Sequence, residues 1–239
     1  MDRYYREHEK VNEYSIIKII GEGRYGIAYM AENKSKEKVV IKQLKKKMLK
    51  DTRKKLFYEK KILKSLDNPE FPKFIGNFRD KYREGYILEY MEGRVFYDYL
   101  AEDGIKYTKE EIYNVAEKLL KLMEILHKKN IVHRDIRLPN VIVKENKELA
   151  LIDFGLARFI DNKKYTKDND YWYLGDFLIH LYYSSFESNN MEAEEKPWYE
   201  ELDLTMEEEL FLKRLMGFEE KFVSDEEVRN ELNIIRNII

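Results

Sequence analysis

The chain has 239 residues, 38% of them charged, and its 44 Lys and Arg against 46 Asp and Glu give a formal net charge of −2. This near-balance argues against a general nucleic-acid or acidic-lipid binder. The absence of cysteine excludes a disulfide framework, thiol chemistry and a zinc–thiolate site, and it favours the cytoplasm. No uncharged apolar run approaches the roughly 20 residues that span a bilayer, and the start of the chain has no apolar leader segment, so we expect neither secretion nor a membrane span.

The first part of the chain predicts a small sheet with one helix. Three short β-type runs follow one another from residue 14 to residue 44, namely SIIKII, GIAYMA and KVVIKQL. A glycine-bearing turn and a polar turn separate them, which predicts three consecutive antiparallel strands. Residues 51–66 have helical spacing, and KFIGNF and GYILEY then predict two more strands. We therefore expect a five-stranded antiparallel sheet with one main helix over residues 1–91.

After residue 91 the pattern becomes mostly helical. Residues 109–128 keep 3.6-residue spacing in their apolar positions, which predicts an amphipathic helix with one buried stripe. A second helix, beginning near residue 170, is apolar on nearly all sides and should lie in the centre of its domain. We therefore predict an α+β fold of two lobes, with residues 92–239 forming a mostly helical second lobe.

The helix over residues 51–66 carries a carboxylate on its apolar face. Leu56, Glu59, Leu63 and Leu66 fall at positions i, i+3, i+7 and i+10, so Glu59 should face the sheet. A lone charge is costly to bury, and Lys42, at the end of an apolar strand, is the obvious partner. Because a buried ion pair is weak evidence of stabilisation, this pair suggests a function.

Three motifs share one order along the chain. Gly21, Gly23 and Gly26 form a G-x-G-x-x-G turn between two predicted strands, which excludes the dinucleotide fingerprint and favours a flap over phosphates. The run from His133 to Asn140, HRDIRLPN, is followed 13 residues after Asn140 by the D-F-G motif that begins at Asp153. With the lysine and the helix glutamate, this set resembles the signature of the eukaryotic-like protein kinases from about residue 14 onward. The Lys, Ile, Asn and Tyr content resembles that of small bacterial members.

The resemblance implies a bilobal kinase fold and a phosphate site in the first lobe. Gly21, Gly23 and Gly26 would let the flap lie on the phosphates of ATP. Lys42, held by Glu59, would contact the α and β phosphates.

The resemblance also implies a catalytic and metal site in the second lobe. Asp135 would accept or orient the proton of the attacking hydroxyl, and Arg137 would supply positive charge against the γ-phosphate, where many protein kinases carry lysine. Asn140 and Asp153 would hold Mg²⁺, or Mn²⁺ in its place. His127 and His133 are expected to be structural residues and not bases.

The expected adenine site follows from the same resemblance. Small and branched side chains would cover the base, a leucine would guard the back of the pocket, and two backbone positions would bond the adenine edge. Ala28 and Val40 would cover the base, and Ile142 would form the floor. Leu88 would guard the back of the pocket, and the backbone of Glu89 and Met91 would bond the adenine edge.

One segment departs from the family pattern. Only 14 residues, 156–169, separate the D-F-G motif from the D-Y-W-Y-L-G run that begins the central helix. Typical protein kinases have more than twice this length there, including a peptide-docking segment and an APE motif, which is absent here. Phe222 stands where the arginine that pairs with the APE glutamate would be expected, so we expect both members of that pair to be missing.

The short segment bears on regulation. Tyr165 and Thr166 are the only hydroxyl residues in it, and it leaves little slack for two arrangements. We therefore expect a constitutively competent enzyme in which Arg134 bonds local backbone, or an acidic residue such as Asp161 or Asp168, and does not capture a phosphate.

Three functions fit these residues. We favour an ATP-dependent Ser/Thr protein kinase, because small-molecule kinases usually read HGD where this chain reads HRD. The alternatives are a small-molecule or lipid kinase and a nucleotide-binding pseudokinase scaffold, although the intact Lys42, Asp135, Asn140 and Asp153 count against the scaffold. The expected partners are ATP and an unidentified hydroxyl acceptor, without nucleic acid or a membrane.

Overall fold

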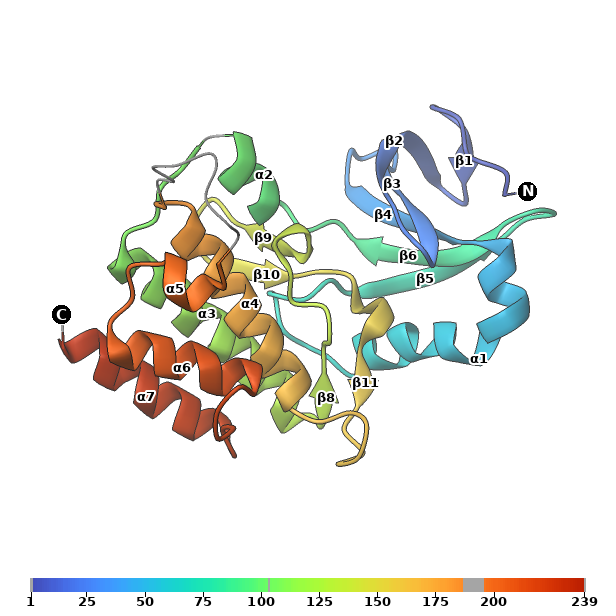
Figure 1. Ribbon diagram of the computed structural model, residues 1–239. Coiled ribbons are helices and arrows are strands. Elements are labelled where there is room, and N and C mark those ends of the chain that lie inside the picture. The colour runs from blue at the N-terminus through green and yellow to red at the C-terminus, as the bar shows by residue number, and fades with distance from the viewer. Residues whose placement is uncertain (1, 103, 187–195, 239) are drawn as a thin grey trace. The chain divides into compact units, whose positions relative to one another are not determined.

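The computed structural model describes residues 2–102, 104–186 and 196–238, with all their side chains except those of residues 48 and 50–57. Its contacts group into two compact units, residues 1–92 and 93–239, called here the N-terminal and C-terminal units (Figure 1). The division falls one residue after the boundary predicted from the sequence. None of the helices in the described ranges has the length and apolar character needed to cross a bilayer.

The N-terminal unit is built on an antiparallel six-stranded sheet of order β1-β2-β3-β4-β6-β5. Its strands are β1 (Lys10–Val11), β2 (Tyr14–Glu22), β3 (Gly26–Glu32), β4 (Lys38–Leu44), β5 (Phe74–Arg79) and β6 (Glu84–Glu89). The five predicted strands are all present. The sixth, β1, is only two residues long and is too short to produce a periodic pattern in the sequence.

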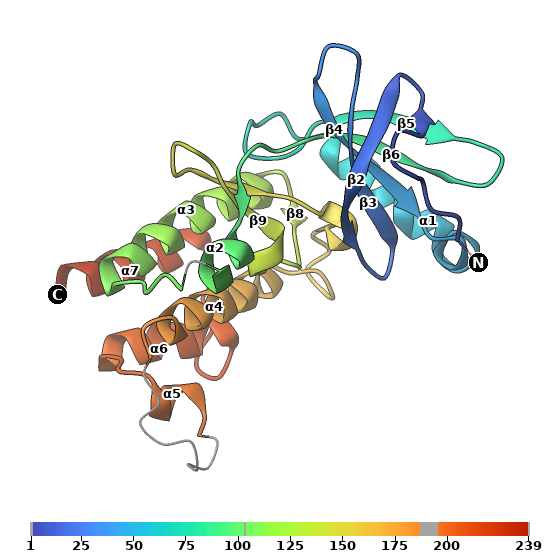
Figure 2. The same ribbon diagram turned by 90° about the horizontal axis from the view of Figure 1, so that it is seen from above.

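The two faces of this sheet contact different parts of the N-terminal unit. Neighbouring residues along a strand point to opposite faces. Tyr29, Ile41 and Ile87 are buried on one face, and the ring of Tyr5 packs edge-on against that of Tyr29 at 5.5 Å. The other face carries Lys42 and, as Figure 2 shows, lies beside α1 (Lys46–Leu63).

Helix α1 begins five residues earlier than predicted and ends three residues earlier. Its start is stabilised by the carboxylate of Asp2, which accepts a hydrogen bond from the amide of Lys46 at 2.8 Å. Such an acceptor satisfies one of the free amides at a helix N-terminus, and it comes from a distant part of the chain. Of the predicted apolar stripe, Leu63 and Leu66 are buried, whereas Leu56 lies outside the described side chains.

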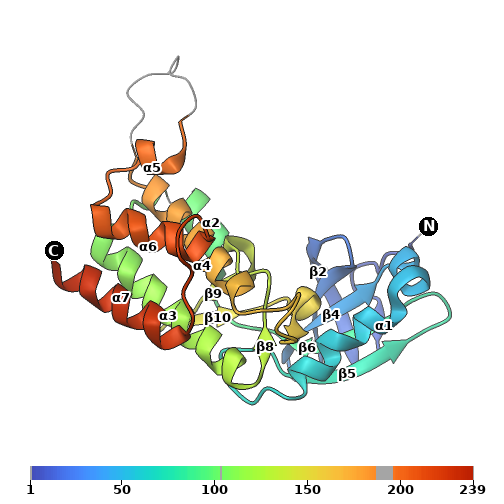
Figure 3. The same ribbon diagram turned by 60° about the horizontal axis from the view of Figure 1, so that its bottom comes forward.

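The C-terminal unit is mostly helical, as predicted. Its helices are α2 (Phe96–Glu102), α3 (Lys109–Lys128), α4 (Asp168–Tyr183), α5 (Trp198–Glu201), α6 (Met206–Met216) and α7 (Asp225–Ile238). Helix α3 has the predicted bounds because Thr108 and Glu111 form a capping box at its start. The apolar helix α4 packs against α3 and α6, and α7 covers α3 and α6 (Figure 3).

Short strands in the C-terminal unit flank the loops that carry the predicted site residues. One sheet has the order β10-β9-β7 and another pairs β11 with β8. The bounds are β7 (Arg94–Val95), β8 (Ile131–Val132), β9 (Val141–Val143), β10 (Leu149–Leu151) and β11 (Arg158–Phe159), with short 3-10 turns η1 (Leu138–Asn140) and η2 (Phe154–Leu156). The loop from His133 to Arg137 therefore lies between β8 and η1, and Asp153 lies between β10 and η2.

Candidate active site

The glycine turn of the N-terminal unit joins β2 to β3. The amide of Gly23 donates to the carbonyl of Gly26 at 3.0 Å, which closes the turn. A Cβ added to Gly26 would approach the carbonyl oxygen of Gln43 to 2.5 Å, so only glycine fits against β4 there. A Cβ at Gly21 or Gly23 would meet no heavy atom within 4 Å, so the outer rim of the turn is open.

Lys42 and Glu59 form the ion pair predicted from the helix spacing. Lys42 Nζ, on β4, lies 2.6 Å from Glu59 Oε1, on α1, and the two side chains are only 12% and 5% exposed. Because both charges are largely withdrawn from water, the pair fixes the position of the ammonium group relative to the sheet.

The predicted adenine residues of the N-terminal unit share the sheet face of Lys42. Ala28 is paired with Lys42 across β3 and β4, and Val40 is paired with Leu88 across β4 and β6, so their side chains project from the same face. The amide of Glu89 donates to the carbonyl of Lys73 at 2.9 Å, so this amide is already engaged within the protein.

The two remaining adenine candidates are both buried. Met91 lies near the end of the N-terminal unit, and Ile142 lies on β9 of the C-terminal unit. The role of this set in binding adenine stays a prediction.

Asp135 is held from both sides in the C-terminal unit. Asn140 Nδ2 donates to the carboxylate at 2.7 Å and to the backbone carbonyl of Asp135 at 2.9 Å. The guanidinium of Arg137 donates from Nε at 2.6 Å and from Nη2 at 3.1 Å. This hydrogen bonding to Asp135 raises the pKa of Arg137. In this arrangement the fork of Arg137 is engaged by Asp135, so a contact between Arg137 and a γ-phosphate requires the pair to open.

Asn140 and Asp153 supply the oxygen atoms suited to a hard cation. Because Asn140 uses its amide nitrogen on Asp135, its side-chain oxygen is the atom left for a ligand. Asp153 has a left-handed backbone, with φ of 61°, and its carboxylate accepts from the amide of Gly155 at 3.1 Å. The described residues contain no cluster of three or more His, Cys, Asp or Glu side chains that could hold a metal. The side-chain oxygens of Asn140 and Asp153 fit Mg²⁺, because this ion prefers oxygen ligands and is usually bound by one or two carboxylates together with phosphates and water.

The carboxylate of Asp170 anchors the loop from His133 to Arg137, called here the catalytic loop after the role expected of Asp135. The sequence analysis did not predict this contact. Asp170 is fully buried at the start of α4. It accepts hydrogen bonds from the backbone amides of Arg134, at 2.7 Å, and His133, at 2.9 Å. Arg134 has a φ of 66°, so these bonds hold the loop in a backbone conformation that non-glycine residues rarely adopt. The local signal was the D-Y-W-Y-L-G run that begins with Asp170, but the first turn of α4 also contains Asp168, and the run does not show which residues Asp170 bonds.

The two histidines are structural, as predicted. Burial lowers the pKa of His133, whose ring lies 4.7 Å from that of Phe154. His127 lies between two carboxylates, with Nε2 3.1 Å from Asp170 and Nδ1 2.6 Å from Asp225. Burial opposes its charge, but hydrogen bonds to Asp170 and Asp225 raise the pKa of His127.

An ion pair joins the segment before α4 to the start of α7. Lys167 Nζ, just before α4, lies 2.7 Å from Asp225 Oδ2. Phe222, which stands where the arginine of the family pair would be expected, is buried, with its ring 5.6 Å from that of Phe211 and 6.5 Å from that of Tyr171. The Lys167–Asp225 pair was not predicted from the sequence, since its two residues are 58 positions apart.

Arg134 bonds local backbone, which confirms the first of the two contacts expected for it. Its Nη1 donates to the carbonyl of Leu156 at 3.0 Å, and its guanidinium carbon lies 4.6 Å from the centre of the Tyr165 ring. The acidic alternative was wrong. Asp161 accepts three amides of its own turn, and Asp168 pairs with Lys221 at 3.1 Å.

A family model described as the protein kinase domain matches residues 14–188 of the chain. The chain belongs to the protein kinase family. This confirms the resemblance, and the two-unit fold of this kinase agrees with it.

The chain is similar to kinases of bacterial and eukaryotic origin. It is 32% identical over 230 residues to the probable serine/threonine-protein kinase YbdM of Bacillus subtilis, covering 93% of this chain and 89% of that protein. It is 32% identical over 159 residues to myosin light chain kinase A of Dictyostelium discoideum, covering 64% of this chain and 53% of the relative. It is 26% identical over 168 residues to human NUAK family SNF1-like kinase 1, covering 69% of this chain and 25% of the relative. Similarity along nearly the whole chain is thus found with the bacterial kinase.

Proposed function

We propose that this kinase transfers the γ-phosphate of ATP to serine or threonine hydroxyls of proteins. The observation that carries the proposal is the carboxylate of Asp135, held by Asn140 at 2.7 Å and by Arg137 at 2.6 Å on a loop of the family pattern. The bacterial relative named as a probable serine/threonine-protein kinase supports the choice of acceptor. We place the reaction in the cytoplasm, since a chain without cysteine has no disulfide framework.

Asp135 orients the acceptor hydroxyl and takes its proton as the oxygen bonds to the γ-phosphorus and ADP leaves. The carboxylate is suited to this because two side chains fix its direction before the substrate arrives. Transfer of a phosphoryl group depends mainly on positioning and on neutralising charge. Arg137, half exposed beside Asp135, adds a cation at this point.

Lys42 and the glycine turn contribute in the N-terminal unit. The ammonium of Lys42, positioned by Glu59, binds phosphate oxygens, and the open rim at Gly21 and Gly23 lets backbone amides approach them. In the C-terminal unit, Asn140 and Asp153 would hold Mg²⁺ through their side-chain oxygens, and the ion would supply neutralisation of phosphate charge.

Transfer of label from γ-labelled ATP to a dephosphorylated lysate tests the proposal. We expect Asp135→Asn to lower transfer by about 100-fold or more, the range for loss of a catalytic base. Asp203→Asn is the matched control, because Asp203 is exposed outside the site, and it should keep wild-type transfer. Equal rates for wild type and Asp135→Asn would contradict the proposed role.

The same assay separates the alternatives. Label that enters a protein-free metabolite pool, and not lysate proteins, would identify a small-molecule kinase. ATP binding without transfer to either pool would identify a pseudokinase. We expect Lys42→Met to impair transfer as well, because it removes the phosphate contact and leaves the carboxylate of Glu59 without this ammonium.

A further inference from the structure

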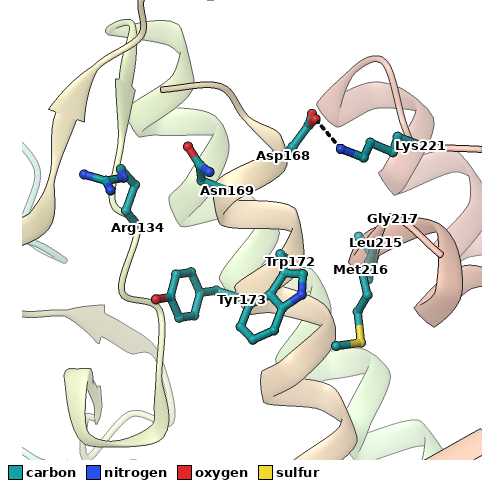
Figure 4. A pocket seen from close by; sticks show the side chains of 9 residues that line it. All are labelled: Arg134, Asp168, Asn169, Trp172, Tyr173, Leu215, Met216, Gly217 and Lys221. Atoms are coloured by element: carbon teal, nitrogen blue, oxygen red, sulfur yellow. Dashed lines mark hydrogen bonds and ion pairs between the residues drawn. The ribbon is translucent and has the colours of Figure 1, made fainter. Parts of the chain in front are cut away.

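The C-terminal unit has a hollow of about 320 Å³ between the first turns of α4 and the end of α6. Figure 4 shows Asn169, Trp172 and Tyr173 entering it from α4, and Met216 and Lys221 closing its other side. At Gly175 the two helices lie close together, because a Cβ added there on α4 would approach Met216 Cγ to 2.8 Å.

The hollow opens beside the catalytic loop. Arg134, which lines it, directly precedes Asp135 in the chain. Tyr173, on α4, also lines it. A segment held in the hollow therefore lies beside the loop that carries Asp135.

The polar side of the hollow offers hydrogen-bond donors that the described protein leaves unused. The guanidinium of Arg134 has five N–H groups, and its only hydrogen bond to described residues goes to the carbonyl of Leu156. Asn169 accepts from the amide of Thr166 through its oxygen, so its amide nitrogen is turned away from that bond. The carboxylate in the lining, Asp168, is paired with Lys221 at 3.1 Å. The donors that remain fit an anionic group.

The other side of the hollow is an exposed aromatic surface. Trp172 is 40% exposed, although it lies in the most apolar helix of the unit. Its indole packs edge-on against the ring of Tyr173 at 5.3 Å, and Met216 lies across the hollow from it (Figure 4). Large aromatic side chains of this kind anchor protein partners.

We propose that this hollow docks an acidic segment of the protein acceptor, with a carboxylate on Arg134 and Asn169 and an apolar side chain on Trp172. The inference rests on the proposed function, because it names the class of protein that reaches Asp135. The choice of an acceptor segment follows from the continuity of the hollow with the catalytic loop and from its unused donors.

Binding of a fluorescein-labelled peptide of glutamate, leucine and one serine tests the proposal, with a lysine-for-glutamate peptide as comparison. Asn169→Asp keeps the oxygen that accepts from Thr166 and replaces the donor nitrogen by a charged oxygen. We expect it to weaken binding of the acidic peptide about tenfold, because a charge-assisted bond becomes repulsive. Trp172→Ala should weaken binding similarly. Asn233→Asp adds the same charge at an exposed position of α7 outside the hollow and should bind as wild type.

Three results overturn the docking proposal. The first is that the wild type does not bind the acidic peptide saturably. The second is that wild type and Asn169→Asp bind the peptide equally well. The third is that the wild type is a dimer that Asn169→Asp dissociates, which would assign the hollow to a second copy of the chain. Peptide binding does not depend on turnover. A kinase that binds the peptide but transfers no phosphate therefore contradicts the proposed function and leaves the docking site standing.

Discussion

Replacing Asp170 by asparagine should disconnect the catalytic loop from α4 without changing the shape of the side chain. One oxygen of Asp170 faces the amide of Arg134, and the other faces the amide of His133 and the ring of His127. Asparagine has one oxygen and one NH₂ group, so in either orientation a donor meets a buried donor. The substitution also removes the charge that these bonds share.

The expected loss of stability follows from these contacts. A hydrogen bond to a charged group contributes roughly 1.5 to 3 kcal/mol, and Asp170→Asn disrupts at least one such bond and weakens the others. Breaking a buried charged network typically costs about 4 kcal/mol in unfolding free energy. For a chain of this size that lowers the melting temperature by about 8 to 16 °C.

Calorimetry of Asp170→Asn and of the control Asp168→Asn tests the expected fall in melting temperature. Asp168 lies two residues earlier, its side chain is 43% exposed, and its pair with Lys221 should contribute less than about 1 kcal/mol. We also expect at least tenfold lower kcat for Asp170→Asn at a temperature where it is folded, because Asp135 follows the released amide of Arg134. Equal melting temperatures for the two variants, or wild-type kcat in folded Asp170→Asn, would refute this account of the loop.

Two further predictions concern pH and regulation. The hydrogen bonds to Asp170 and Asp225 raise the pKa of His127 above its unfolded value, so its stabilising effect is complete below about pH 6.5 and is lost as the pH rises through the folded value. The carboxylate of Asp225 has a lowered pKa and stays charged over this pH range. His127→Gln should therefore lower the unfolding free energy more at about pH 5.5 than at about pH 9. A loss of unfolding free energy that does not change with pH would contradict the assignment. Thr166→Ala and Tyr165→Phe should keep kcat/KM within about threefold, since neither removes the aromatic ring beside Arg134, whereas Tyr165→Leu removes a contact of roughly 1 kcal/mol. Strong activation that accompanies phosphate incorporation at either hydroxyl would show a switch instead.

Local periodicity was sufficient for the main elements and for one functional contact. The alternating strands β3 and β4 and the stripe of α3 follow from spacing alone, since each of these elements buries one face. The Lys42–Glu59 pair was also predictable, because a carboxylate on the apolar face of a helix needs a partner. Ordered motifs then marked Asp135, Asn140 and Asp153 as candidate site residues, and their roles stay predictions.

The sequence by itself therefore determined the family, the two-unit organisation and the residue types that phosphoryl transfer needs. Only the tertiary structure decided how those residues are held. The bonds of Asp170 to the catalytic loop, the Lys167–Asp225 pair and the capping of α1 by Asp2 each join residues 36 or more positions apart. Contacts at such separations have no local period, because their geometry is set by how whole elements pack and not by the turn of one helix or the pleat of one strand.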